Sequence, residues 1–194
     1  QFSKFIRINL NILAFAYAFF YLLWGFNYFR KNVNERLYIS EQKPDKELFI
    51  RTTEKIIDNT NKLWFDFEKA DLTKTDSLIE GAYNLCSRAL KIDFPAGKRN
   101  DKKITFSGFF AQAGISGYYG PFFNEVHVNT KILPVEYPFV LAHEKAHQFG
   151  VTSEAEANFY AWLVCTQSNS KQLQYSGNLQ ILRYLLNQTY QLEE

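Results

Sequence analysis

The stretch His143 to His147 reads His-Glu-x-x-His, and it restricts this part of the chain to one kind of structure. Residues four apart share a face of a helix, so both imidazoles can reach one metal ion if the segment is helical. Glu144 then lies beside that face, where it can take a proton from a water held by the metal. The chain has only three histidines, and this motif uses two of them. The motif therefore predicts a helix that carries a metal site, with Zn²⁺ as the expected ion.

The residues after the motif decide which third ligand is available. Metzincin peptidases place a third histidine where this chain has Ser153, and they need a methionine turn beneath the metal. The chain contains no methionine, so the metzincin pattern fails on both counts. Pro138 is suited to the first turn of the motif helix, and Gly150 can end it in a left-handed conformation. A second helix can then begin after Ser153.

The second helix offers two glutamates as the third ligand. Ser153 and Glu156 have the spacing of a capping box, which would give Glu156 a structural role. Glu154 is therefore the expected ligand, and Glu156 is the alternative. Asn158, one turn after Glu154, is placed to hydrogen-bond a ligand imidazole and fix its tautomer. Two histidines and one carboxylate leave a coordination position open, as in a catalytic zinc site.

The N-terminal run Ile8 to Phe29 contains no charged residue and is long enough to cross a bilayer core as a helix. Tyr17 and Trp24 are aromatics of the kind found in interfacial belts. No small-residue cleavage site follows the run, which favours a membrane span over a signal peptide; a buried core helix is the other alternative. We expect a transmembrane helix within 1–32, with upstream spans missing because the chain does not begin with methionine, and a catalytic domain over 33–194.

Helical patterns dominate the rest of the chain. We expect helices over 44–64 and 77–90, the second opened by a capping box of Ser77 and Glu80, and a final helix after Gly177. Short strands are expected between the helices, over 104–107, 114–119 and 125–129. The expected fold class is thus α+β and mainly α, with a small hairpin or sheet before the motif helix and one transmembrane helix ahead of the domain.

Charge and cysteine content limit the partners. A net charge of +2, without a basic stripe that interleaves with aromatics, gives no indication of a nucleic-acid partner. Cys86 and Cys165 lie in apolar helical contexts, which is typical of buried thiols. A disulfide between them is the alternative.

Three further side chains are weaker candidates for the site. His127 is expected to be an ordinary strand histidine, because its side chain points away from those of the flanking valines. Tyr160 and Tyr175 could stabilise an oxyanion, as a tyrosine does in some zinc peptidases. With 12 tyrosines in the chain, neither assignment is specific.

A longer series of short motifs surrounds these residues, at 24–30, 114–117, 121–125, 129, 143–150, 154–159 and 175–177. Together they resemble a bacterial family, domain of unknown function 3810, whose members look like membrane-anchored zinc metallopeptidases of the glutamate zincin type (gluzincins). The stretch from Glu154 to Asn158 departs from that pattern by having asparagine where aspartate is usual, and an amide is the weaker acceptor. The resemblance implies a zincin-like domain behind three N-terminal spans, and hence a periplasmic domain on the bacterial inner membrane.

We therefore expect a membrane-anchored zinc metallopeptidase, a hydrolase that cuts a peptide or protein substrate beside a lipid bilayer. His143, His147 and Glu154 would hold zinc, and Glu144 would activate the zinc-bound water. The alternative is a non-catalytic membrane protein with a structural or vestigial zinc site.

Overall fold

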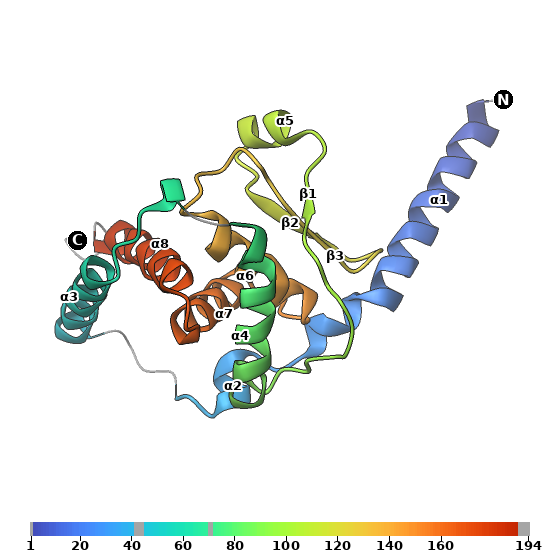
Figure 1. Ribbon diagram of the computed structural model, residues 1–194. Helices are drawn as coiled ribbons and strands as arrows, with labels where there is room; N and C mark the ends of the chain where they lie inside the picture. The colour runs from blue at the N-terminus through green and yellow to red at the C-terminus, as the bar shows by residue number, and fades with distance from the viewer. Residues whose placement is uncertain (1, 41–44, 70–71, 190–194) are drawn as a thin grey trace.

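The computed structural model of the protein describes residues 2–40, 45–69 and 72–189. It is mainly helical, with a three-stranded sheet and an apolar N-terminal helix that projects from the rest of the molecule (Figure 1). The helices are α1 (Phe2–Leu23), α2 (Val33–Leu37), α3 (Lys46–Lys62), α4 (Thr75–Leu90), α5 (Ser107–Gln112), α6 (Tyr137–Gln148), α7 (Glu154–Gln167) and α8 (Lys171–Thr189). Short 3-10 helices cover Gly25–Phe29, Phe67–Lys69 and Leu72–Lys74, and the strands are β1 (Lys102–Lys103), β2 (Gly117–Gly120) and β3 (Glu125–Val128).

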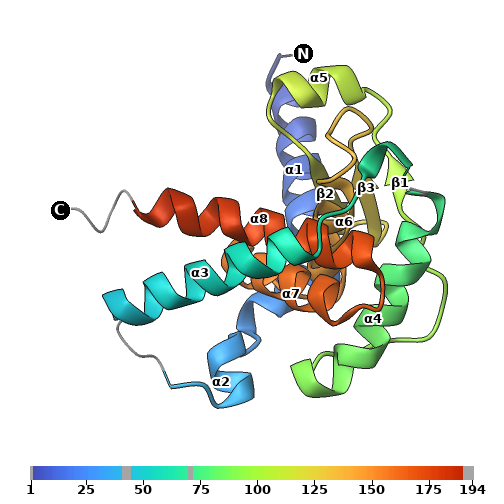
Figure 2. The ribbon, with the colours of Figure 1, turned by 60° about the vertical axis from the view of Figure 1, so that its left-hand side comes forward.

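The motif helix α6 is the centre of the fold. It contacts α4, α7 and α8, and it also contacts β2 and β3 of the sheet. Leu141 and Ala142 are fully buried, and Tyr83 of α4 donates a hydrogen bond of 2.6 Å to the Ala142 carbonyl. Helix α3 lies alongside α8 on the far side of the domain from α1 (Figures 1 and 2). Any side chain that α6 directs between the sheet and α7 is thus held in a rigid environment.

The sheet has the strand order β1-β3-β2, with β1 parallel and β2 antiparallel to β3. Strand β2 is an edge strand, because its outer side pairs with no other strand in the part of the chain that the structure describes. The predicted strand over 104–107 is wrong: β1 covers the two preceding residues, and Ser107 begins α5. The Ser107 hydroxyl donates to the Ile104 carbonyl at 2.6 Å, which turns the chain out of the sheet.

Helix α1 is long and apolar enough to cross a membrane, and none of its residues is buried. It can therefore serve as a membrane anchor or a signal sequence, whereas a buried core helix is excluded. The helix ends at Leu23 rather than continuing to Phe29, because the chain tightens into a 3-10 helix. A Cβ on Gly25 would lie 2.5 Å from the ring of Tyr21, so this close turn depends on glycine.

The starts of α3 and α4 can be compared with the starts that the sequence predicted. The helix predicted over 44–64 is present as α3, which Asp45 caps by accepting a hydrogen bond from the Glu47 N–H at 3.3 Å; residue 44 lies outside the described residues. The capping box predicted at Ser77 and Glu80 is wrong, because α4 begins at Thr75.

The final helix also begins earlier than predicted. Gly177 lies inside α8 rather than before it, and it serves close packing: a Cβ there would lie 2.7 Å from the Cβ of Cys165 on α7. Cys86 and Cys165 are both free and buried, which confirms the prediction of buried thiols.

Candidate metal centre

Three side chains from α6 and α7 converge on one point. The Nε2 atoms of His143 and His147 lie 3.2 Å apart. One carboxylate oxygen of Glu154 lies 3.1 Å from Nε2 of His143, and the other lies 3.4 Å from Nε2 of His147. This group could hold a metal ion.

The loop that joins α6 to α7 brings Glu154 to this point. Pro138 lies in the first turn of α6, and Gly150 follows the helix with φ of 88°, the left-handed conformation. The Ser153 hydroxyl accepts a hydrogen bond from the Glu156 N–H at 3.5 Å and so caps α7. These three sequence predictions are confirmed. Because the loop is tight, the first residue of α7 faces the last turn of α6.

Both imidazoles are held from behind by acceptors. Nδ1 of His143 lies 2.8 Å from Oδ1 of Asn158, and Nδ1 of His147 lies 2.8 Å from the Val151 carbonyl oxygen. Carbonyl oxygens only accept hydrogen bonds, so each neutral ring carries its proton on Nδ1. The lone pair of each Nε2 then points toward the other histidine and Glu154.

The donor set fits a divalent cation. Ligand atoms in a tetrahedral zinc site lie about 3.3 Å apart, given Zn–N distances of about 2.0–2.1 Å. The separations among His143, His147 and Glu154 run from 3.1 to 3.4 Å. Burial, and next the neighbouring His147, lower the pKa of His143, which keeps its ring neutral and able to bind a metal. Two imidazole nitrogens with one carboxylate form a donor set of catalytic zinc sites.

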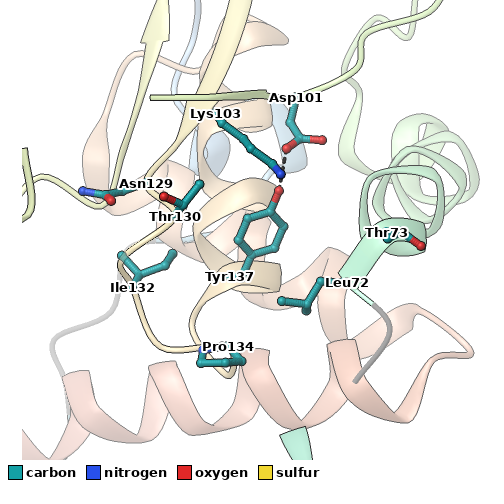
Figure 3. Close-up of a pocket in the computed structure, with 9 residues that line it drawn as sticks. All are labelled: Leu72, Thr73, Asp101, Lys103, Asn129, Thr130, Ile132, Pro134 and Tyr137. Carbon is teal, nitrogen blue, oxygen red and sulfur yellow. Dashed lines mark hydrogen bonds between the residues drawn. The ribbon is translucent and has the colours of Figure 1, made fainter. Parts of the chain in front are cut away.

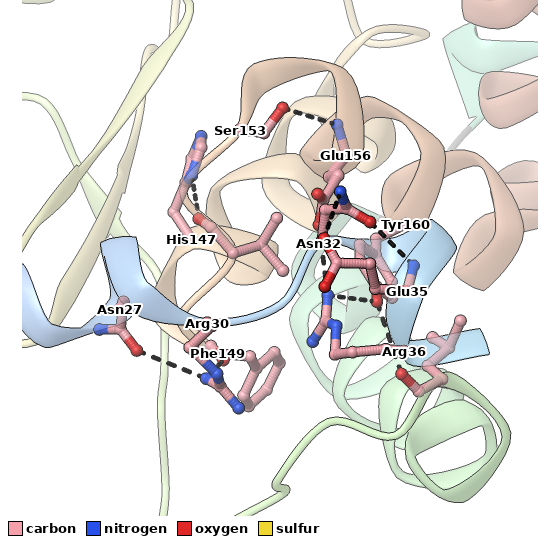
Figure 4. Close-up of polar contacts among 12 residues, drawn as sticks. Asn27, Arg30, Asn32, Glu35, Arg36, His147, Phe149, Ser153, Glu156 and Tyr160 are labelled. Carbon is pink, nitrogen blue, oxygen red and sulfur yellow. Dashed lines mark hydrogen bonds and ion pairs between the residues drawn. The ribbon is translucent and has the colours of Figure 1, made fainter. Parts of the chain in front are cut away.

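The alternative ligand, Glu156, is engaged elsewhere. Nη2 of Arg36, on α2, lies 3.2 Å from a carboxylate oxygen of Glu156 and donates to the Tyr160 hydroxyl at 2.8 Å (Figure 4). Both side chains of the ion pair are largely buried. The Glu156 side chain is therefore held by a cation from the segment after α1. Of the predicted capping box, the half in which the Ser153 hydroxyl accepts from the Glu156 N–H is present, while the Glu156 carboxylate binds Arg36.

The same segment also contacts the loop between the metal-site residues. Arg30 donates to the Phe149 carbonyl at 2.9 Å, next to the left-handed Gly150 (Figure 4). A Cβ on Gly150 would collide with the side chains of Arg30 and Asn27. The chain that leaves α1 is thus packed directly on the loop that positions Glu154.

Glu144 lies beside the metal-site residues in a nearly buried position, with 7% of its surface exposed. Burial, and to a smaller extent the charge of Glu154, raise the pKa of Glu144 to about 8. A cation bound nearby would favour the carboxylate and lower this pKa. The proton affinity of Glu144 is therefore set by its burial and by Glu154, and it would respond to a cation bound beside it.

Strand β2 approaches Glu144 so closely that the position opposite it must be a glycine. A Cβ on Gly117 would lie 2.9 Å from Cγ of Glu144 and 3.0 Å from the His127 carbonyl oxygen. Gly117 thus lets strand β2 approach the Glu144 side chain more closely than any larger residue would allow.

Two cavities meet at the metal-site residues. The first, of about 410 Å³, is lined by residues 114–117 and by Gln180 and Tyr184 of α8. The second, of about 390 Å³, is lined by 117–119 and by aromatic residues of the N-terminal segment. Both share Gly117 with His143, Glu144 and Glu154. Together they form a groove along β2 with the metal-site residues at its middle.

The weaker candidates from the sequence lie outside this groove. His127 stacks on Tyr118 of the neighbouring strand with ring centroids 4.6 Å apart, as an ordinary strand histidine can. Tyr160 is buried in the core, and Tyr175 packs near Phe67. Neither tyrosine lines either cavity.

Tyr184, like Gln180 beside it on α8, is a groove residue that the sequence did not indicate. It lies on α8, is 42% exposed and lines the first cavity with His143 and Glu144. The motif at 175–177 lies in α8 but does not include Tyr184, so only the packing of α8 against α6 places Tyr184 at the groove.

A separate cavity of about 400 Å³ lies near the start of α6 (Figure 3). Its wall includes Tyr137, whose hydroxyl donates to Asp101 at 2.5 Å, together with Lys103 and Thr130. It shares no lining residue with the two cavities of the groove. It is therefore not part of the candidate metal centre.

Comparison with known proteins identifies a family for this chain but no individual protein that matches it. A family model described as "Protein of unknown function (DUF3810)" matches residues 1–194. No curated protein matches the chain, and no solved structure matches it. Because the family model covers the whole chain, the protein belongs to the DUF3810 family.

Proposed function

We propose that the protein is a membrane-anchored zinc metallopeptidase with a zincin-like fold, which hydrolyses peptide bonds. The observation that carries the proposal is the convergence of His143, His147 and Glu154, with Glu144 beside them at the middle of a groove. The proposal includes a periplasmic domain on the bacterial inner membrane, because the family resemblance implies three N-terminal spans.

Each residue has a distinct chemical role in this proposal. Zinc, when bound, lowers the pKa of a water ligand and polarises a carbonyl group. The Nδ1 hydrogen bonds to Asn158 and the Val151 carbonyl keep the Nε2 lone pairs of His143 and His147 free for the metal. Glu144 accepts a proton from the attacking water and later gives it to the leaving amine.

An extended polypeptide suits the groove. The free side of β2 offers backbone N–H and C=O groups, to which a substrate can add as a further strand. The cavities lie on both sides of the metal-site residues along this strand and can accept side chains before and after the cut bond. Tyr184 is close enough to the groove to contact the bound chain.

The rival function is a non-catalytic protein in which zinc only joins α6 to α7. A structural zinc site generally has four protein ligands. Among the residues that the structure describes, the group contains only His143, His147 and Glu154. An open coordination position and a buried carboxylate next to it favour catalysis.

The first prediction concerns the metal. The chain of residues 1–194, purified in detergent without chelators, should contain about one zinc per chain by elemental mass spectrometry. Glu154→Gln should weaken zinc binding by about 100-fold or more, since removing even an indirect partner of a ligand costs about 10- to 100-fold. The matched variant Glu156→Gln should keep its zinc, because Glu156 binds Arg36. Loss of zinc from Glu156→Gln alone would reverse the ligand assignment.

Cleavage of an unfolded protein such as casein completes this test. Cleavage should stop when 1,10-phenanthroline removes the zinc and should return when zinc is restored. A protein that binds zinc but cleaves no unfolded polypeptide would support the structural rival.

The second prediction concerns the glycine that faces Glu144. Gly117→Ala should slow hydrolysis by about 100-fold, because a displacement of the base by about 1 Å is enough for such a loss. Zinc should stay bound, since the three atoms nearest to the added Cβ belong to Glu144 and His127 and not to the three proposed ligands. Gly120→Ala on the same strand is the matched control, because a Cβ there would meet its nearest atom at an ordinary 3.6 Å. Equal cleavage rates for the two variants would remove Gly117 from the proposal.

A further inference from the structure

The turn between β2 and β3 ends in an apolar tip. Residues 117–124 contain no charged side chain, and Phe122 and Phe123 are 44% and 81% exposed. Each Å² of apolar surface left in water has a free energy about 25 cal/mol higher than the same surface covered by other apolar groups. Two neighbouring exposed phenylalanines on one turn therefore indicate a surface that is covered in the working protein.

The tip is fixed relative to the metal centre. Asn124 adopts a left-handed conformation with φ of 54°, and its side chain accepts a hydrogen bond from the Tyr119 hydroxyl at 3.1 Å. Its carbonyl accepts from Gln148 Nε2 at 2.6 Å. Gln148 is the last residue of α6, so this hydrogen bond ties the tip to the helix that carries His143 and His147.

The tip lies against the side of α1, before the end of that helix is reached. The Phe122 ring stacks on Phe19 with centroids 6.1 Å apart, and it lies 6.4 Å from Phe20. Phe19 is one turn before Leu23, so this contact is about 6 Å inside the end of α1. Figure 1 shows the turn between β2 and β3 reaching toward α1.

We infer that the hairpin tip, Pro121 to Asn124, inserts into the interface of the bilayer that α1 crosses and forms a second membrane contact. The inference rests on the proposed role of α1 as a membrane anchor. A ring stacked on the side of a membrane helix is at the depth of the lipids that surround that helix. Trp24, just after α1, lies 5.8 Å from Tyr119 at the base of the hairpin, and such aromatics favour the membrane–water boundary.

A second membrane contact at this place orients the groove. Phe20, Trp24, Tyr119 and Pro121 line the cavity that also contains His143 and His147. This end of the groove therefore opens at the lipid surface. A polypeptide that enters from this end approaches the metal centre along the bilayer, so the preferred substrate is a chain that is itself held in or on the membrane.

Fluorescence from three labels, each attached to the chain of residues 1–194, tests the inference. The chain is reconstituted into vesicles of phosphatidylcholine and phosphatidylglycerol, and an environment-sensitive fluorophore is attached to Phe123→Cys, Leu13→Cys or Glu54→Cys. The native cysteines are buried and should stay unlabelled in the folded protein. Phe123 is exposed, so its replacement should not disturb the fold. Glu54 lies on α3, on the far side of the domain from α1 (Figure 1).

The three labels give distinct outcomes. The label at 123 should be quenched by lipids that carry a nitroxide near the headgroup, and the label at 13 by lipids that carry it deep in the acyl chain. The label at 54 should be quenched only by iodide in the water. If the label at 123 responds to iodide and not to lipid nitroxide while the label at 13 is in lipid, the hairpin inference is wrong and the anchor stands. If the label at 13 is also in water, the proposed anchoring itself is wrong.

Discussion

Glu144→Gln is expected to abolish peptide hydrolysis while zinc stays bound. Glutamine nearly matches the shape of glutamate, so it can occupy the same space beside Gly117. Its amide cannot take up and release the proton, and the loss of a general acid–base group costs about 10²- to 10⁴-fold in rate. The fold should not weaken, because glutamine carries no charge. It therefore avoids the free-energy cost of burying a carboxylate, which is the cost that raises the pKa of Glu144.

Zinc content and the rate of casein cleavage, measured on the same preparations, check this prediction. Glu144→Asp is the informative companion, since it keeps the carboxylate but withdraws it by one methylene. It should retain zinc and show an intermediate rate. A Glu144→Gln protein that cleaves casein as fast as the original chain would exclude Glu144 as the base.

Lys145→Met is expected to destabilise the protein by about 3–5 kcal/mol. Lys145 is fully buried, and its Nζ lies 2.8 Å from Asp76 and 2.7 Å from Glu80, both on α4. Without the lysine, these carboxylates are left in a poorly solvated place, where burial already raises the pKa of Asp76. For a chain of this length, the expected fall in Tm is roughly 6–20 °C.

Thermal unfolding followed by near-ultraviolet circular dichroism measures this effect. Lys55→Met, at an exposed lysine of α3, is the matched control and should change Tm little. Adding Asp76→Asn to Lys145→Met should recover part of the loss, because Glu80 keeps its 2.8 Å ion pair with Arg99. A Lys145→Met protein with the Tm of the Lys55→Met protein would show that the buried ion pairs contribute nothing to stability.

Local sequence signals predicted the parts of the site that depend on neighbouring residues. The helix around His143 and His147 follows from side-chain spacing, and the reversal at Gly150 and the cap at Ser153 follow from backbone chemistry. The contact between Asn158 and His143 follows from helix geometry once α7 is placed. These features need only short-range rules, so one sequence is enough to find them.

Features that depend on contacts between distant segments were missed or misplaced. The spacing of Ser77 and Glu80 suggested a capping box, but Glu80 is used by Lys145 and Arg99, which are far away in the sequence. Likewise, Glu156 was kept from the metal by Arg36, a residue 120 positions earlier. Tertiary ion pairs outweigh local capping preferences when both partners are buried, and spacing alone cannot show them.

The contacts of the segment between α1 and α3 limit how the chain can be shortened for crystallisation. A water-soluble fragment that begins at residue 33, where the expected catalytic domain starts, keeps Arg36 but loses Arg30 and its hydrogen bond to the Phe149 carbonyl. A fragment that begins after α2 also leaves Glu156 without its cation. A fragment that begins at Gly25 keeps Arg30 together with the whole 3-10 helix that precedes it. The choice of where an expressed fragment begins therefore decides whether the loop before Glu154 keeps its hydrogen bond to Arg30.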